Sequence, residues 1–229
     1  MPAASSPSNR QLKNRLDCVI WDMDGVLIDS MEYQFEVWQA IFREYGVVFD
    51  RANFNRHFGT TNLQTIQKTL GDRITLEEAV ALAERKQVIS EQQSIQRARL
   101  VPGVDRWLQY FQDASIPQAV ASSNTQSFIE ATARQLNIDL FFTTLVSAEG
   151  LASKPDPAVF LEAARRMHAS PSQCLVVEDA IAGVEGARRA GMKCLAVATT
   201  NPAAALQAAD LVVVDFASLH EKQILELMS

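Results

Sequence analysis

The chain has 229 residues, of which 48% are hydrophobic and 21% are charged, a composition typical of a globular protein with one or two domains. Its formal net charge of −6 argues against a general nucleic-acid binder, which usually carries a basic face. The sequence has no apolar run long enough to span a membrane and no apolar core of a secretory signal near its first residues, so we expect a cytoplasmic protein without a membrane or nucleic-acid partner.

The first predicted strand ends in an unusual pair of carboxylates. Residues 1–14 are rich in Ser, Pro, Ala and Asn and predict a disordered tail. The apolar run at residues 18–21 then predicts a buried strand, which Asp22 and Asp24 follow directly. Two carboxylates held together repel each other unless they are protonated or neutralised by a cation. Strand alternation would place both on one side, where their oxygens could bind one small ion.

The next segment, residues 30–101, predicts helices only. Residues 31–45 carry large apolar side chains at intervals of three and four, as one buried helix face requires, and Gly46 ends the pattern. Further helical patterns cover residues 63–70 and 76–96. We therefore expect an all-helical domain here.

From residue 102 onward short apolar strands alternate with amphipathic helices. Strands are predicted at residues 118–121, 144–146, 174–177, 194–197 and 211–214. Helices are predicted at residues 103–113, 125–136, 156–168, 181–190 and 202–208. This alternation predicts an α/β fold with a doubly wound, mostly parallel, Rossmann-like sheet. Residues 15–29 and 102–229 would form this core, with the helical domain inserted between them.

Polar side chains follow four of the predicted strands. After Asp22 and Asp24, these are Ser122 behind residues 118–121, Lys154 in the loop behind residues 144–146, and Glu178-Asp179 behind residues 174–177. Taken singly, a solvated lysine or a helix-capping Ser, Glu or Asp would explain the later ones. Because ligands of open parallel sheets bind beyond the carboxyl ends of the strands, the set predicts one site for a divalent cation and a phosphate.

The segments DMDGVLIDS, ASSN, KPDP and VVEDAIAGVEGARRAG, in that order, resemble the four motifs of the haloacid dehalogenase superfamily of phosphotransferases. The resemblance covers nearly the whole chain outside the tail. The helical insertion resembles the helical-cap subclass, and the sequence is most similar to its β-phosphoglucomutase and phosphoglycolate phosphatase branch. In this family the cap contacts the leaving group.

The resemblance implies a role for each core residue. Asp22 would be the nucleophile that forms an aspartyl-phosphate, and Asp24 would be the general acid and base. Ser122 would hydrogen-bond the phosphoryl oxygens, aided by backbone N–H groups near Ser123 and Asn124.

The remaining core motifs imply charge balance and a metal ion. Lys154 would balance the negative charge of the phosphate and the nucleophile. The cofactor implied is Mg²⁺, bound by oxygen ligands. Its expected ligands are Asp22, Asp24 through its carbonyl, Glu178 and Asp179.

The helical domain must then decide the substrate. The mutases of this branch carry a histidine and an arginine where this chain has Gln34 and Asn62, whereas Lys86 could match a third cap cation. The segment FGTTN at residues 58–62 is similar to the cap loop of small-molecule phosphatases. The candidate substrate-binding residues are Ser123 and Asn124 of the core, together with five residues of the helical domain: Gly59, Thr60, Asn62, Gln34 and Lys86.

We therefore expect a monomeric, Mg²⁺-dependent phosphatase acting on a small phosphorylated metabolite of the sugar-phosphate kind. The alternative is a hexose-phosphate mutase of the β-phosphoglucomutase kind that uses the same phosphoaspartate. A catalytically silent binding module is a third, less favoured reading, because the full set of acidic, hydroxyl and lysine positions is present.

Overall fold

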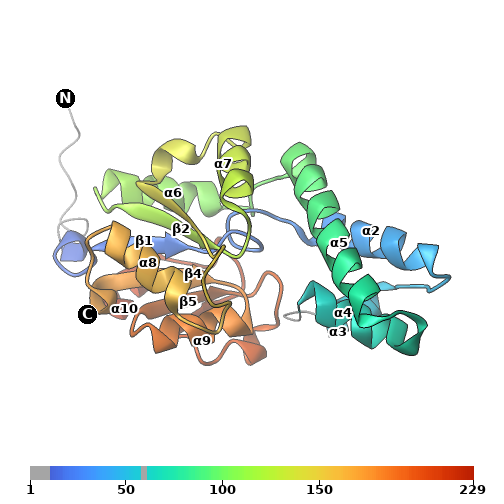
Figure 1. Cartoon of the computed structure of the whole chain (residues 1–229). Coiled ribbons are helices and arrows are strands. Elements are labelled where there is room, and N and C mark those ends of the chain that lie inside the picture. The colour runs from blue at the N-terminus through green and yellow to red at the C-terminus, as the bar shows by residue number, and fades with distance from the viewer. Residues whose placement is uncertain (1–10, 58–60) are drawn as a thin grey trace. The chain divides into compact units, whose positions relative to one another are not determined.

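The computed structural model of the protein describes residues 11–57 and 61–229. The chain divides into two compact units, which Figure 1 shows as a unit built around a sheet and a helical unit. The first comprises Met1–Asp29 and Arg99–Ser229, and the second comprises Ser30–Ala98. The helical unit thus ends three residues before the predicted position 101. The reason is that Arg99 and Val101 bond back to the segment behind the first strand, through Asp29 N to Arg99 O at 2.9 Å and Val101 N to Leu27 O at 3.0 Å.

The first unit is built on a six-stranded, wholly parallel sheet in the order β3-β2-β1-β4-β5-β6. Its strands are β1 (Cys18–Trp21), β2 (Gln118–Ser122), β3 (Thr144–Ser147), β4 (Cys174–Glu178), β5 (Lys193–Val197) and β6 (Leu211–Val213). The doubly wound α/β fold predicted from the sequence is confirmed. The winding direction reverses between β1 and β4, and open parallel sheets bind ligands at such a reversal.

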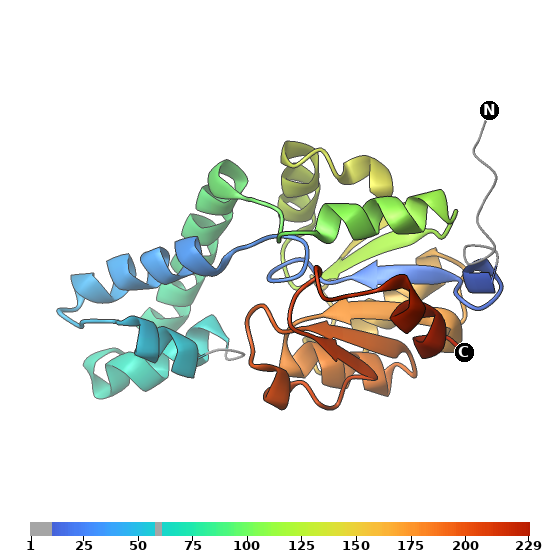
Figure 2. The same cartoon turned by 180° about the vertical axis from the view of Figure 1, so that it is seen from behind.

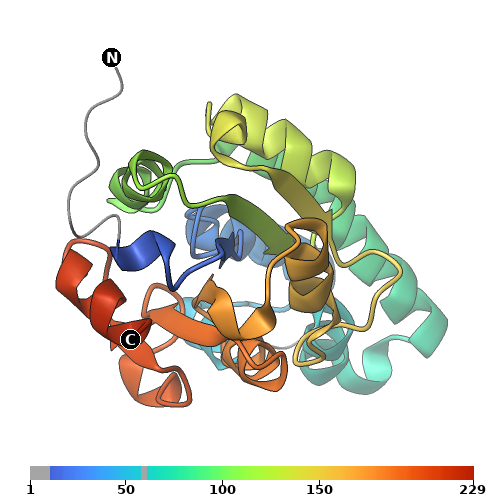
Figure 3. The ribbon, with the colours of Figure 1, turned by 90° about the vertical axis from the view of Figure 1, so that its left-hand side faces the viewer.

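Helices cover both faces of this sheet, as the end-on view in Figure 3 shows. They are α6 (Val104–Asp113), α7 (Gln126–Gln135), α8 (Ala158–Arg166), α9 (Ile181–Arg189) and α10 (Glu221–Leu227). Figure 2 shows α6 and α10 in front of the sheet, with α8 and α9 on its other face. Both faces of the central strands are therefore buried, which explains why these strands are apolar throughout.

The side chains of β1 divide between the two faces of the sheet. Cys18 and Ile20 join a buried cluster with residues of α8 and α9. Trp21 points to the opposite face, where its ring lies 6.0 Å from Phe111 of α6 and 6.2 Å from Phe216. This two-sided burial anchors β1 in the middle of the sheet and holds the residues that follow it in place.

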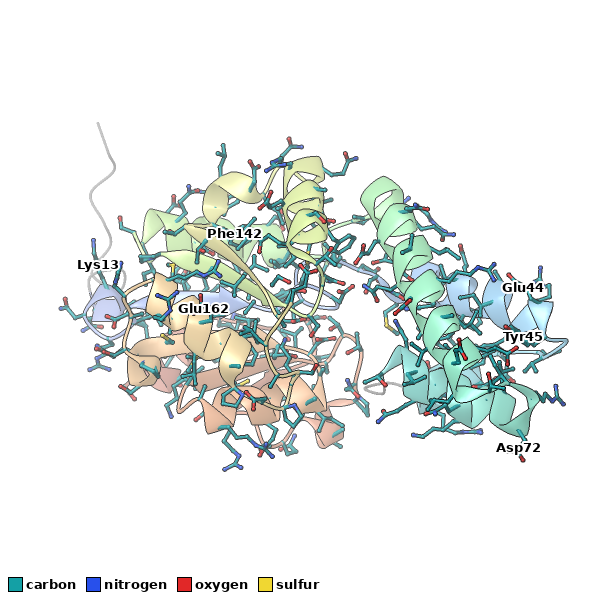
Figure 4. The ribbon with its side chains drawn as sticks, in the orientation of Figure 1. Lys13, Glu44, Tyr45, Asp72, Phe142 and Glu162 are labelled. Carbon is teal, nitrogen blue, oxygen red and sulfur yellow. The ribbon has the colours of Figure 1, made fainter. Side chains whose placement is uncertain are left out.

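The second unit is all-helical and has its own core. It contains α2 (Met31–Glu44), α3 (Arg51–Arg56), α4 (Asn62–Leu70), a 3₁₀ turn η1 (Gly71–Arg73) and α5 (Leu76–Arg97). Phe42 stacks on Trp38 with 5.2 Å between the ring centres and lies 4.6 Å from Phe49. At the end of α2, Glu44 (labelled in Figure 4) accepts a hydrogen bond of 2.6 Å from Arg85 of α5.

Three predicted or missed elements differ from the structure. The helix expected at residues 202–208 is only a 3₁₀ turn, η4 (Ala203–Ala205), because a run of three alanines offers little apolar area to bury. Two short helices escaped prediction because they have no long apolar period. Polar caps begin both: Asp50 accepts from Asn53 N at 2.7 Å before α3, and His220 N donates to Gln223 at 2.8 Å before α10.

The predicted tail, residues 1–14, extends too far toward the core. Residues 11–13 form a helical turn, and the side chain of Leu12 is 0% exposed. Burial of this leucine adds apolar contact that favours order in the segment, and composition alone does not reveal it. Residues 1–10 lie outside the described part of the chain. Among the described helices, none has the length and apolar character needed to cross a membrane.

Candidate active site

Five consecutive strands of the sheet deliver a polar residue to the same edge. Asp22 follows β1, Ser122 ends β2, Ser147 ends β3, Glu178 ends β4, and Thr199 follows β5. The parallel register aligns these ends, with Ser122 opposite Ser147. The cluster therefore arises from strand length and register, not from proximity along the chain.

Lys154 links the first and fourth strands of this edge through two carboxylates. Its Nζ donates to Asp22 Oδ1 at 2.5 Å and to Glu178 Oε1 at 2.6 Å, and its side chain is only 10% exposed. Burial would lower the pKa of Lys154, but the two carboxylates outweigh it and raise that pKa above its ordinary value. Lys154 is therefore a permanently charged group at the centre of the site.

Asp22 is one of the two carboxyls that Lys154 contacts. Burial raises its pKa to about 7, with the charges of Glu178 and Asp24 acting in the same direction and Lys154 opposing them. Lys154 occupies Oδ1, and within residues 11–57 and 61–229 the second carboxylate oxygen of Asp22 has no hydrogen-bond partner. A buried carboxylate with one such oxygen is suited to act as a nucleophile or a metal ligand.

The Glu178 carboxylate is held on both of its oxygens. Oε1 accepts from Lys154, while Oε2 accepts from the backbone N–H groups of Asp179 and Ala180, each at 2.8 Å. Gly183 of α9 makes room for it, because a Cβ there would overlap the Glu178 carboxylate. Glu178 thus positions the lysine and the start of the loop that carries Asp179.

The Asp179 side chain is fixed by the loop that follows β5. Thr200 Oγ1 donates to Asp179 Oδ2, and Asn201 Nδ2 donates to the Asp179 carbonyl at 3.0 Å. Burial, followed by the charges of Glu178 and Asp22, raises the pKa of Asp179 well above its ordinary value. Gly25, with φ of +77°, passes so close that a Cβ would collide with this carboxylate.

Asp22, Glu178 and Asp179 could together hold a metal ion. One oxygen from each lies within 4.8 Å of the others. Within the described residues, Lys154 is the only cation that forms ion pairs with members of this trio, so three buried carboxylates face one positive charge. Hard oxygen donors with excess negative charge fit a divalent cation. The Asp24 carboxylate is not part of this group.

Asp24 instead contacts the end of β2. Asn124 Nδ2 donates to Asp24 Oδ2 at 2.6 Å and to Ser122 Oγ at 3.1 Å. The Asn124 backbone N–H also donates to Ser122 Oγ, at 3.2 Å. Ser123, the other predicted substrate contact here, is exposed.

The predicted substrate residues of the helical unit form a separate polar cluster. Lys86 Nζ donates to Gln34 Oε1 at 2.5 Å and lies 4.9 Å from the Trp38 ring centre. Asn62 donates to Gln87, the neighbour of Lys86, at 3.2 Å. The structure thus brings Gln34 and Lys86 together and places Asn62 beside the next residue of α5. Gly59 and Thr60 lie outside the described residues.

Sequence reasoning missed the polar residues behind β3 and β5. Ser147 Oγ donates to the Asn124 carbonyl at 2.6 Å, and Thr199 Oγ1 donates to the Gly25 carbonyl at 2.5 Å. Thr200 and Asn201 hold Asp179, as described above. Ser147 directly follows the predicted strand at residues 144–146, and residues 199–201 follow the predicted strand at residues 194–197 after one alanine. The same signal that selected Ser122 and Glu178 could therefore have found them.

Comparison with known proteins shows which proteins the chain is similar to. Residues 19–197 match the family model described as haloacid dehalogenase-like hydrolase. The β-phosphoglucomutase of Bacillus subtilis is 32% identical over 86% of this chain and 89% of its own length. The phosphorylated carbohydrates phosphatase of Thermotoga maritima is 29% identical over 78% of this chain and 83% of its own length.

A solved structure has a similar fold. The HAD hydrolase of family IA, variant 3, from Entamoeba histolytica superimposes with a TM-score of 0.82, covering 93% of this chain and 99% of its own. Its sequence identity is 22%, so this likeness concerns the fold alone.

Proposed function

The chain belongs to the haloacid dehalogenase-like hydrolase family, and on this premise we propose that it is a Mg²⁺-dependent phosphatase of a small phosphorylated metabolite, of the sugar-phosphate class. The relatives named as a carbohydrate phosphatase and as a mutase support an enzyme of phosphoryl transfer. The observation that carries the proposal is the buried Asp22, whose one oxygen is held by Lys154 while the other remains available for attack.

The proposed reaction has two steps on Asp22. The available Asp22 oxygen attacks phosphorus, the bond from phosphorus to the ester oxygen breaks, and Asp24 gives its proton to the departing alkoxide. The Asp24 carboxylate then takes a proton from water, which attacks the aspartyl-phosphate and releases inorganic phosphate. Asp22 is regenerated as a carboxylate and Asp24 as the acid, so the cycle balances.

The other residues of the site would support both steps by charge and position. Lys154 and the Ser122 hydroxyl are suited to stabilise negative charge on the transferring phosphoryl oxygens. Asp22, Glu178, Asp179 and the Asp24 carbonyl would hold Mg²⁺. When bound, the cation supplies positive charge that offsets the carboxylates and the phosphoryl group.

A mutase remains the second candidate because of the 32% identical β-phosphoglucomutase. A mutase must grip a sugar bisphosphate at both phosphates, which calls for several cations. Among the residues that we propose select the substrate in the helical unit, Gln34 and Asn62 are neutral and Lys86 alone is cationic. This charge pattern favours transfer to water.

A panel of phosphomonoesters, assayed for inorganic phosphate with Mg²⁺ and with a chelator, tests the proposal. We expect Mg²⁺-dependent release from at least one sugar phosphate and its loss in Asp22→Asn. Conversion of β-glucose 1-phosphate to glucose 6-phosphate without phosphate release would instead establish the mutase. Unchanged phosphatase activity in Asp22→Asn would exclude the aspartyl-phosphate route.

A further inference from the structure

Asn124 lies between two residues of the proposed mechanism and touches both. Its side-chain amide donates to Asp24 Oδ2 at 2.6 Å and to Ser122 Oγ at 3.1 Å. Its backbone N–H donates to the same Ser122 oxygen at 3.2 Å. The two bonds to Ser122 hold the bend that follows β2, and the bond to Oδ2 joins this bend to the Asp24 carboxyl group.

The direction of the Asn124 amide follows from its partner. Nδ2, not the amide oxygen, lies 2.6 Å from Asp24 Oδ2, so Asn124 presents its NH₂ group to Asp24 and Oδ2 accepts the bond. That NH₂ group has two protons, and Asp24 and Ser122 take one each. Phosphoryl oxygens are acceptors, so Asn124 could bond a phosphate through Nδ2 only by releasing one of these residues.

Counting donors and acceptors also shows which hydrogen bond the Ser122 hydroxyl can make to a substrate. A hydroxyl has two acceptor lone pairs and one proton. Both bonds from Asn124 end on the Ser122 oxygen and use its two acceptor sites. The hydroxyl proton is what remains, so Ser122 is left as a pure donor, which is the form that a phosphoryl oxygen requires.

Asn124 is itself anchored from the neighbouring strand. Ser147, the last residue of β3, donates from Oγ to the Asn124 carbonyl at 2.6 Å. The parallel register sets Ser147 opposite Ser122. Hydrogen bonds therefore connect Ser147 to Asn124, and Asn124 to both Asp24 and Ser122.

We propose that Asn124 is a positioning residue, anchored by Ser147, that fixes the Asp24 carboxyl and turns the Ser122 hydroxyl into a donor. This inference rests on the proposed function and revises the expected role of Asn124 as a substrate contact. Because Asn124 occupies Asp24 Oδ2, the proton for the leaving alkoxide is carried on Oδ1. Asn124 thereby selects the oxygen from which the proton is transferred.

Two substrates separate this role from phosphate binding. An alkyl phosphate needs a proton on its leaving oxygen, whereas p-nitrophenyl phosphate releases a stable phenolate without one. Comparing kcat/KM isolates the first step, in which the ester bond breaks. General acid catalysis contributes roughly 10²–10⁴-fold, so we expect Asn124→Ala to lower kcat/KM at least about tenfold more for the alkyl phosphate than for the aryl phosphate.

Two serine variants complete the comparison. Ser147→Ala should shift the alkyl-to-aryl ratio in the same direction as Asn124→Ala but less, because Asn124 keeps its bonds and loses only its anchor. Ser127→Ala, which changes an exposed serine in the first turn of α7, should leave the ratio unchanged. An equal loss on both substrates with a raised KM in Asn124→Ala would show that Asn124 binds phosphate directly, and no loss would also overturn the proposal.

A measurement that does not depend on turnover tests the positioning role of Asn124 independently of the proposed phosphatase function. In ¹H–¹⁵N spectra, the side-chain amide signals of Asn124, identified by their absence in Asn124→Ala, should shift in Asp24→Ala because one proton loses its acceptor. Unshifted signals would refute the Asn124 contact even if the enzyme is a phosphatase. If the wild type releases no phosphate from any ester, the proposed function fails, while the spectra still decide whether Asn124 holds Asp24.

Discussion

At the residue scale, we expect Lys154 to affect both the stability and the activity of the protein, although it lies in a loop. Its Nζ forms ion pairs with Asp22 and Glu178 at 2.5 and 2.6 Å in a region nearly closed to water. A carboxylate that loses its partner in such a place keeps the full cost of burial without the compensating attraction. The free energy of unfolding and the activity should therefore both depend on this one side chain.

The variant Lys154→Met tests this dependence. We expect the metal-free protein to lose about 3–5 kcal/mol of unfolding free energy, the usual cost of breaking a buried pair, and the phosphatase activity to fall to background. Denaturant titration and phosphate release measure the two effects. Lys193→Met is the matched control, because Lys193 pairs with Asp210 at 2.9 Å while 43% exposed, and such pairs contribute about 0–1 kcal/mol. Equal losses in the two variants would contradict the argument.

The raised pKa values of Asp22 and Asp179 predict how stability depends on pH. The pKa of Asp22 is raised to about 7 in the folded protein, so between the ordinary pKa of an aspartate and this value the folded protein binds more protons than the unfolded chain. The stability of the metal-free protein therefore falls as pH rises through this window. The exposed Glu162 and Glu185 have a pKa lowered to about 2 by their arginine partners, so their effect is confined to more acidic pH.

Denaturant titrations with a chelator, near pH 5 and near pH 8, measure this dependence. We expect lower stability at the higher pH, and recovery on adding Mg²⁺, because a bound cation offsets the carboxylate charge. In Asp22→Asn the pH dependence should shrink. Stability that increases between these two pH values in the metal-free wild type would disprove the prediction.

At the scale of elements, the N-terminal turn of α9 is shaped around Glu178. Gly183 is required there because any Cβ would overlap the Glu178 carboxylate. On propensity alone, alanine should stabilise this helix by about 1 kcal/mol. Packing against the preceding strand end therefore outweighs helix propensity at this position.

Gly183→Ala should displace the Glu178 carboxylate and, with it, Lys154. We expect lower thermal stability and at least a tenfold loss of kcat/KM, as misplaced supporting groups commonly cause about 10–100-fold losses. Gly186→Ala, in the same helix, is the control, because its Cβ would meet the Phe160 ring at 3.1 Å and not a site residue. If Gly183→Ala were as active as Gly186→Ala, the close packing of Glu178 would have no functional consequence.

At the scale of the whole molecule, the chemistry and the proposed selection of substrate lie in different units. The carboxylates and Lys154 belong to the sheet unit, whereas Gln34, Asn62 and Lys86 belong to the helical unit with its own aromatic core. Lys86 is only 5% exposed, with its Nζ bonded to Gln34. Burial and the bond to Gln34 therefore fix the position of the Lys86 ammonium group within the helical unit.

Lys86→Met separates the two functions, because methionine keeps much of the apolar stem and removes the charge. We expect kcat/KM for the preferred sugar phosphate to fall at least about fivefold, because one hydrogen bond to a charged group is lost. Turnover of p-nitrophenyl phosphate should stay nearly constant. A parallel melting curve checks the fold, and an equal loss on both substrates would argue against a role in selection.

The sequence predicted the sheet and the position of the proposed site for a clear reason. Strands buried on both faces are short apolar runs, so β1 and β4 could be recognised without a structure, and the polar residues behind them had to lie at one edge. The same reasoning could not find α3 or α10, whose caps are polar and whose apolar faces are short. It also left the ordered turn around Leu12 inside the predicted tail.

The sequence by itself determined which residue types stand at the ends of the strands, and hence the family and the class of chemistry. Only the tertiary structure decided how those residues are bonded. The hydrogen bonds from Ser147 to Asn124, from Asn124 to Asp24 and from Thr200 to Asp179 join residues that are 21 to 100 positions apart along the chain. Such contacts depend on register and atom position to within the length of a hydrogen bond, and residue order alone does not specify distances on that scale.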